Sequence, residues 1–309
     1  MTSQVPVLQR QVGQLDLSLS QISFGSMRLD PRANTADTSA FLCSLFDAGV
    51  DTHHSSFEYD SYPHYCEAVR SVRTSGRHPK HIVKLAEPSF DHHEFDAGRF
   101  IAAVDRELTA LGTESIANVQ WMVRTPEPAS STSLGAFHGA TEALGAVADE
   151  LRAAGKIESL SVFPYSAAEA QTTIDSGIAD AQCVYLNLLE RGDLKHLEQI
   201  PTIALRPVSG GALSSRNPFW CTDAGQAVIE EVRSAGELAA STIADVAMSW
   251  PLLHSGVSTV VVSLVDDPRL LSTLLAVGQV APQPERFRKM RAAAERLPHR
   301  EVLLDKLLG

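Results

Sequence analysis

The stretch Gly49–Tyr59, with the sequence GVDTHHSSFEY, and the run 81–86, with the sequence HIVKLA, decide how the chain is organised. Residues 50–54 begin with the apolar Val50 and end in polar side chains, as a strand does where it meets a functional loop. Residues 63–72 have helical spacing, so a helix separates two strands. A strand, a helix and a second strand in this order predict two parallel neighbours in one sheet.

The same alternation continues along the chain in both directions from this unit. Nearly continuous apolar runs, typical of strands that are buried on both faces, recur eight times, and helical sequence follows each of them. Eight such units predict a (β/α)8 barrel, and no G-x-G-x-x-G motif follows the first strand to favour a Rossmann domain. The expected strands are 22–25, 50–54, 81–86, 116–123, 159–163, 181–186, 202–205 and 258–263.

Two patterns concern the domain organisation. Residues 7–12 and 15–19 alternate around Gly13 and Gln14, which predicts an N-terminal β-hairpin that covers the bottom of the barrel. The linkers between the strand–helix units are short, and none has the composition of a domain boundary. We therefore expect residues 1–309 to form a single barrel domain with its functional side chains at the C-terminal ends of the strands.

The composition limits the classes of function. A net charge of −11 and a pI near 5.4, without a long cluster of Lys and Arg, argue against a nucleic-acid surface. No window approaches 18 apolar residues, and no basic segment followed by an apolar run begins the chain, so we expect neither secretion nor membrane insertion. The four cysteines form no C-x-x-C pair, which suits reduced thiols in a cytoplasmic protein.

Tyr59 and Lys84 are the strongest candidates for a chemical role. The loop after the strand 50–54 presents Tyr59, and Lys84 lies within the apolar run of the next strand, where a lysine is costly to bury without a purpose. A cation beside a phenol lowers the pKa of the phenol and makes it a usable acid near neutral pH. The sequence therefore predicts that Tyr59 and Lys84 form a proton-donating pair.

Several segments lie in an order and spacing that resemble one known family. They include Gly49–Tyr59, LGTE at 111–114, GKI at 155–157, ALRP at 204–207 with Gly211, and PRL at 268–270. In this arrangement the chain resembles the aldo-keto reductase family. The resemblance implies a (β/α)8 barrel that reduces carbonyl compounds with NADPH, using aspartate, tyrosine, lysine and histidine.

Only half of the family's catalytic residues are kept. The family's tyrosine and lysine correspond to Tyr59 and Lys84, but His54 occupies the aspartate position and Met122 the histidine position. Asp51 cannot replace the aspartate, because a strand turns its side chain to the other face from His54. A neutral His54 could accept a hydrogen bond from Lys84. We propose Arg124, nearer the strand end than Met122, as a substitute for the lost hydrogen-bond donor.

The positions for the cofactor NADP are also altered. The resemblance keeps the family's glutamine as Gln182 and its arginine as Arg269, and a pyrophosphate could rest on the backbone of the loop that contains Gly210 and Gly211. The remaining positions are substituted. The carboxamide-binding Ser-Asn pair corresponds to Phe163-Pro164, the stacking aromatic residue to Leu205, the 2′-phosphate ligands to Ser263 and Leu264, and the asparagine to Thr273.

The sequence leaves three functions open. The first is a divergent NAD(P)H-dependent oxidoreductase of aldo-keto reductase type that acts on a small carbonyl substrate. The second is a lyase or isomerase that uses the same side chains as acids and bases on a polar or sugar-like substrate. The third is a catalytically inactive barrel with a binding or regulatory role. No metal is expected, because adjacent histidines on a strand, such as His53 and His54, point to opposite faces, and the pairs 53–54 and 92–93 lack the spacing of histidine ligands.

Overall fold

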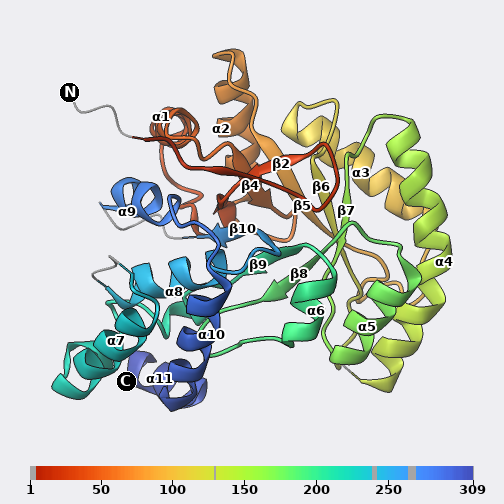
Figure 1. The fold of residues 1–309 in the computed structure, drawn as a ribbon. Coiled ribbons are helices and arrows are strands. Elements are labelled where there is room, and N and C mark those ends of the chain that lie inside the picture. The colour runs from red at the N-terminus through yellow and green to blue at the C-terminus, as the bar shows by residue number, and fades with distance from the viewer. Residues whose placement is uncertain (1–4, 129, 239–241, 264–268, 309) are drawn as a thin grey trace.

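The computed structural model describes residues 5–128, 130–238, 242–263 and 269–308. Within these residues eight parallel strands close into a barrel in the order β10-β3-β4-β5-β6-β7-β8-β9 (Figure 1). The predicted (β/α)8 barrel is confirmed. Its strands are β3 (Ile22–Gly25), β4 (Thr52–Ser55), β5 (Lys80–Ala86), β6 (Asn118–Met122), β7 (Leu160–Val162), β8 (Ala181–Tyr185), β9 (Thr202–Leu205) and β10 (Val257–Val262).

Helices surround the barrel (Figure 1). In the part of the chain that is described they are α1 (Thr35–Asp47), α2 (Tyr62–Thr74), α3 (Ala97–Leu111), α4 (Ser131–Ala153), α5 (Ala167–Ser176), α6 (Leu194–Gln199), α7 (Asp223–Ala235), α8 (Ile243–Leu252), α9 (Leu270–Val277), α10 (Pro284–Ala293) and α11 (Arg300–Leu308). Short 3-10 turns add η1 (Ser26–Arg28), η2 (Ser209–Gly211), η3 (Pro218–Cys221) and η4 (Ala294–Arg296). Across the described ranges no helix combines the length and apolar character needed to cross a bilayer.

The N-terminal hairpin forms as predicted. Strands β1 (Gln9–Gln11) and β2 (Ser18–Ser20) pair antiparallel. Leu19 belongs to the same buried cluster as Ile82 of β5 and Ile203 of β9, and all three side chains are fully buried. The hairpin therefore closes the end of the barrel opposite to the C-terminal ends of the strands.

Alternation along the strands determines which side chains reach the barrel interior. On β5, Ile82 belongs to the interior cluster, whereas Val83 and Leu85 pack with the outer helices. Lys84 shares the face of Ile82 because successive side chains of a strand point to opposite faces. On β4, His53 and His54 separate in the same way, as the sequence predicted: His53 contacts Tyr65 of α2, and His54 faces inward.

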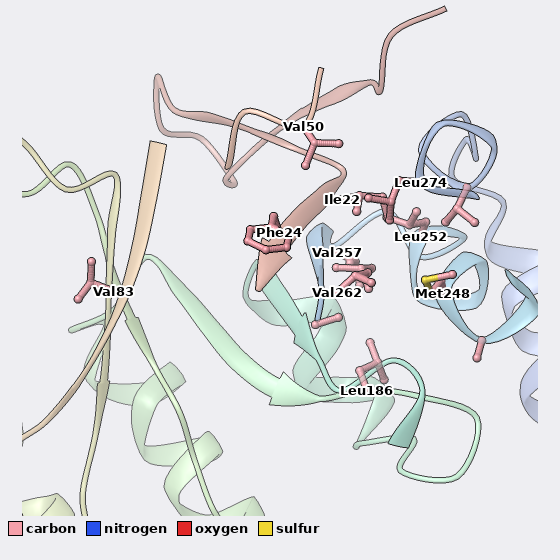
Figure 2. Packing of buried hydrophobic residues seen from close by; sticks show 14 of the residues in the cluster. Ile22, Phe24, Val50, Val83, Leu186, Met248, Leu252, Val257, Val262 and Leu274 are labelled. Carbon is pink, nitrogen blue, oxygen red and sulfur yellow. The ribbon is translucent and has the colours of Figure 1, made fainter. Parts of the chain in front are cut away.

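Besides the apolar cluster in the barrel interior, a second hydrophobic core lies between the barrel strands and the surrounding helices. Figure 2 shows Met248 and Leu252 of α8 facing Ile22 and Val257 of the barrel. These four side chains are completely buried, and burial of each aliphatic side chain of this size contributes roughly 1.5–3 kcal/mol. This packing fixes the strands, and the strands in turn fix the positions of the side chains at their ends.

Two buried histidines form a polar cluster in this outer layer. The Tyr65 hydroxyl lies 3.1 Å from Nδ1 of His53 and 3.3 Å from Nδ1 of His81. Nε2 of each histidine is buried and has no hydrogen-bond partner among the described residues. Burial lowers the pKa of His53 to about 4 and that of His81 to about 3, so both rings are neutral in the folded protein near neutral pH.

We expect the protein to lose stability in mildly acidic solution. Below about pH 6.5 the unfolded chain binds protons at His53 and His81, whereas the folded chain does not. The free energy of unfolding is therefore highest above that pH and falls as the pH is lowered towards 4. The loss is about 2 kcal/mol per histidine between about pH 6.5 and pH 5. Urea unfolding near pH 7 and pH 5 measures it. His81→Gln should flatten the dependence, and the exposed control His78→Gln should not. Equal dependence in wild type and His81→Gln would contradict this expectation.

Candidate active site

Polar side chains meet at the C-terminal end of the barrel, which we call the mouth. His54 lies near the end of β4, Lys84 near the end of β5, and Gln120 on β6. The loop after β4 contributes Glu58 and Tyr59. The C-terminal ends of parallel barrel strands all open on one side, and side chains from separate segments are therefore brought together there.

Lys84 is held between a carboxylate and an aromatic ring. Its Nζ lies 2.5 Å from Oε2 of Glu58 and 4.7 Å from the centre of the Tyr59 ring. Only 11% of the Lys84 side chain is exposed, so the ammonium group depends on these contacts in place of water. The structure brings Tyr59 and Lys84 together as predicted. Glu58 was missed, although an acid directly before Tyr59 was a visible signal.

Arg124, two residues after the end of β6, contacts the same carboxylate of Glu58. Its Nη2 donates to Oε2 of Glu58 at 2.8 Å, and its Nη1 donates to the hydroxyl of Tyr165 at 3.0 Å. Burial acts to raise the pKa of Glu58, but hydrogen bonds from Arg124 and Lys84 outweigh it and lower that pKa. Glu58 therefore stays ionised and links two cations, and Arg124 lies at the mouth as predicted.

Tyr59 remains a protonated phenol in this environment. Burial raises the pKa of Tyr59, Glu58 and Tyr185 raise it further, and Arg124 opposes them weakly. The expected lowering of this pKa by Lys84 does not result, because burial and the charge of Glu58 raise it more strongly. Burial lowers the pKa of Lys84 itself, and Glu58 opposes that effect.

His54 is a neutral imidazole beside Tyr59. It is 5% exposed, and its ring centre lies 6.4 Å from that of Tyr59. Burial lowers its pKa to about 4, with the hydrogen bond to Gln120 opposing and the charge of Lys84 adding to the effect. The expected hydrogen bond from Lys84 is replaced by one between Nε2 of His54 and Oε1 of Gln120, at 2.8 Å.

The two other altered catalytic positions also have clear surroundings. Asp51 forms an ion pair with Lys80 at 3.1 Å, at the start of the strands, so it does not reach the mouth. Met122 is 3% exposed and belongs to the apolar cluster of the barrel interior. Neither residue supplies a polar group to the site. Within the described ranges, no group of three His, Cys, Asp or Glu residues could hold a metal ion.

A second group of side chains lies on the opposite side of the mouth. Tyr185 ends β8 in register with Leu205 of β9, and the guanidinium carbon of Arg206 lies 4.4 Å from its ring centre. The Tyr185 ring also packs edge-on against Phe163 at 5.0 Å. Tyr185 is 38% exposed, so one part of its ring surface remains open to a ligand.

The loop after β9 has an unusual backbone. Ser209, Gly210 and Gly211 have φ angles of 48°, 70° and 101°, and the N–H groups of Ser209 and Gly211 donate to the carbonyls of Arg206 and Val208. A Cβ atom at Gly210 would lie 3.5 Å from Nη2 of Arg206 and 3.7 Å from Nη2 of Arg300. Two guanidinium groups therefore converge at Gly210, as they do in sites that bind phosphate.

The model of the aldo/keto reductase family matches residues 21–295 of the sequence. The chain belongs to the aldo/keto reductase family. No curated protein matches the sequence.

Solved aldo-keto reductases share the fold of the chain at low sequence identity. An aldo-keto reductase from Bacillus halodurans has a TM-score of 0.67 at 16% identity, and the match covers 92% of this chain and 96% of that one. A glycerol dehydrogenase from Gluconobacter oxydans has a TM-score of 0.66 at 16% identity, with 96% of each chain covered. An aldo/keto reductase from Klebsiella pneumoniae, solved with NADP and acetate, has a TM-score of 0.61 at 18% identity, with 88% and 90% covered.

In this aldo/keto reductase, the residues expected to bind the cofactor are only partly at the mouth. Gln182 points outward: its Nε2 donates to Oγ1 of Thr202 at 3.1 Å and to the carbonyl of His196 in α6 at 3.3 Å. Its expected contact with the cofactor does not fit this position, because Gln182 alternates with the inward-facing Cys183. Arg269 is exposed and directly precedes α9, and Leu264 lies outside the described residues.

The remaining residues fit one part of a nicotinamide dinucleotide better than the other. The guanidinium groups of Arg206 and Arg300 beside Gly210 fit the phosphates. Tyr185 offers an aromatic ring beside Leu205, which occupies the position of the family's stacking ring. Glu190 forms ion pairs with both guanidinium groups at 3.8 Å, too far for hydrogen bonds, and Nε of Arg300 donates to Oγ of Ser209 at 3.0 Å. Phe163, 4% exposed and without a polar side-chain atom, cannot hold the carboxamide.

Proposed function

We propose that the protein is an NAD(P)H-dependent oxidoreductase that reduces the carbonyl group of a small molecule. The observation that carries the proposal is the position of Lys84, whose Nζ is held over the ring of Tyr59 by the carboxylate of Glu58. Glu58 restores the carboxylate that the His54 position lacks. The family that the chain belongs to uses a lysine and a carboxylate beside its tyrosine in the same way.

The side chains of the mouth suit proton donation to an alkoxide. The bound nicotinamide cofactor would supply a hydride to the carbonyl carbon. Tyr59 would donate its proton to the carbonyl oxygen as negative charge develops there, and its raised pKa does not prevent this because an alkoxide is more basic than a phenolate. Lys84, over the face of the ring, would stabilise the phenolate that remains until solvent returns the proton.

The position of the phosphates leads to a testable prediction for cofactor binding. Arg206→Met removes one guanidinium group from Gly210 but keeps an apolar stem against Tyr185, so we expect the Kd for NADPH to rise about tenfold or more. Isothermal titration calorimetry measures this change. The exposed Arg106 on α3 gives a control, Arg106→Met, that removes the same charge far from the mouth. Equal affinities in the two variants would contradict the assignment of the phosphate site.

Isotope transfer tests the proposed reaction. The protein is incubated with NADPH that carries deuterium at the transferable position and with a panel of aldehydes and ketones, and the products are analysed by mass spectrometry. We expect one deuterium atom on the carbinol carbon of an alcohol product. Conversion of a sugar-like substrate with no dependence on NADPH would instead support the lyase or isomerase reading. Binding of small molecules without conversion would support an inactive barrel.

A further inference from the structure

A pocket lies at the end of the barrel away from the mouth. It has a volume of about 200 Å³, and α6, the segment before β10 and α10 form its walls. Residues 194–198 and 254–256 of this lining come shortly before β9 and β10, and parallel strands all begin at this end of the barrel. None of the residues assigned above to catalysis or to the cofactor lines the pocket, so it is separate from the candidate active site.

His254 presents an unused hydrogen-bond donor in this pocket. The backbone N–H of Gly256 donates to Nδ1 of His254 at 3.1 Å, so Nδ1 accepts and Nε2 of the neutral ring carries the hydrogen. Burial lowers the pKa of His254, which keeps the ring neutral near pH 7. His254 is 7% exposed, and Nε2 has no partner among the described residues, yet it is not one of their unpartnered atoms that are sealed from solvent. The Nε2–H group is therefore open to the pocket and needs an acceptor.

Two opposite charges border the same pocket. Glu198 of α6 and Arg288 of α10 are exposed residues of its lining, and no ion pair joins either of them to another described residue. The charge of Glu198 raises the pKa of His254 and that of Arg288 lowers it, so both charges are near the histidine ring. The pocket therefore offers a carboxylate, a guanidinium group and a neutral N–H donor to one ligand.

The rest of the lining forms an apolar wall. It consists mainly of Leu194 and Leu197 of α6 and Phe287 of α10. Phe287 is 1% exposed, its ring stacks on Trp250 with 4.8 Å between ring centres, and it packs edge-on against His254 at 4.9 Å. These ring contacts hold the apolar wall in place beside the two charges.

We propose that this pocket binds a free α-amino acid with an apolar side chain. The ligand's carboxylate accepts hydrogen bonds from Arg288 and from Nε2 of His254, its ammonium group pairs with Glu198, and its side chain lies against the apolar wall. Glu198 repels a ligand that carries only a carboxylate, and Arg288 repels one that carries only an ammonium group. A molecule with both charges and an apolar side chain therefore fits the pocket better than either. This binding is independent of the reaction proposed for the mouth.

Three related molecules test the proposal by isothermal titration calorimetry on the full chain. L-Leucine carries both charges, 4-methylpentanoate lacks the ammonium group, and 3-methylbutylamine lacks the carboxylate. We expect saturable binding of L-leucine with a Kd about 10- to 100-fold below that of either of the other two. L-Valine and L-methionine extend the test to other apolar side chains. No saturable binding by any of the three amino acids at about 10 mM, or equally tight binding of L-leucine and 4-methylpentanoate, would overturn the inference.

Variants of the two charged residues locate the binding. Both positions are exposed, so Glu198→Gln and Arg288→Met should fold normally. The advantage of L-leucine over 4-methylpentanoate should fall close to one in Glu198→Gln, and its advantage over 3-methylbutylamine should do so in Arg288→Met. The controls Glu114→Gln and Arg106→Met remove the same charges at exposed positions elsewhere and should keep both advantages.

The result that would overturn the inference at this stage is an unchanged Kd for L-leucine in both pocket variants, because the amino acid would then bind elsewhere. The pocket and the mouth share no residue. Failure of amino-acid binding therefore leaves NADPH binding and carbonyl reduction untouched, and failure of the reductase function leaves amino-acid binding untouched.

Discussion

Tyr59→Phe should lower kcat for carbonyl reduction by about 10²- to 10⁴-fold, the usual contribution of a positioned general acid. The substitution removes the only group that this account assigns to protonate the substrate oxygen. The remaining ring still lies below Nζ of Lys84, so the fold and the affinity for NADPH should stay close to wild type. Steady-state rates measured beside a calorimetric Kd for NADPH separate the two effects.

A second tyrosine at the mouth provides the matched comparison. Tyr165→Phe removes a hydroxyl that contacts Arg124 at 3.0 Å and that is assigned no proton transfer. We expect it to lower kcat less than tenfold, through loss of one hydrogen bond. If Tyr59→Phe kept more than about a tenth of wild-type activity, or if both variants lost equal activity, Tyr59 would not be the proton donor.

Glu58→Gln should have the second largest effect. It leaves Lys84 and Arg124 near each other without the carboxylate that they share, and it replaces an ion pair in which Lys84 is 11% exposed and Glu58 27%. We expect the free energy of unfolding to fall by about 1–3 kcal/mol, which is less than for a fully buried pair because solvent still reaches the carboxylate. The pKa of Lys84 should fall further, since Glu58 now raises it.

The loss of Lys84's position should also appear in catalysis. We expect kcat to fall about 10- to 100-fold in Glu58→Gln, because the ammonium group leaves the face of the Tyr59 ring. Glu58→Asp keeps the negative charge on a shorter side chain, so its kcat should lie between that of Glu58→Gln and that of the wild type. Glu114→Gln removes an exposed carboxylate elsewhere and should change neither stability nor rate. If Glu58→Gln kept the wild-type kcat, Glu58 would not take the role of the family's aspartate beside Lys84.

The sequence carried most of the information about the fold. Most barrel strands are short apolar runs followed by helical spacing, and this signal needs no knowledge of distant contacts. The hairpin was predicted by the alternation around Gly13 and Gln14. The same alternation correctly separated His53 from His54, because a strand's pleat is a local property.

The candidate site was less predictable because it depends on contacts between segments that are distant in sequence. Tyr59 and Lys84 followed from the resemblance, but Glu58 reaches Lys84 and Arg124 through the path of a loop, which the sequence does not specify. The predicted contact of Gln182 with the cofactor does not fit the structure for a different reason. A one-residue difference in strand register turns a side chain from the mouth to the outer helices, and its neighbour Cys183 faces inward instead.

The site also shows how neighbouring residues can restore what substitutions remove. Glu58 supplies a carboxylate to Lys84 where His54 has replaced the family's aspartate. Tyr185, in register with Leu205, supplies an aromatic ring beside the position where the family's ring is missing. These side chains lie one strand or one loop away from the altered positions, so a position-by-position comparison with the family does not detect them.

Isothermal titration calorimetry of the protein with NADPH tests the proposed reductase function without any knowledge of the substrate. We expect saturable binding to a single site, weakened by Arg206→Met and unaffected by Tyr59→Phe. An absence of binding by both NADPH and NADH at concentrations of about 1 mM, where a Kd as weak as millimolar would be detected, would contradict it.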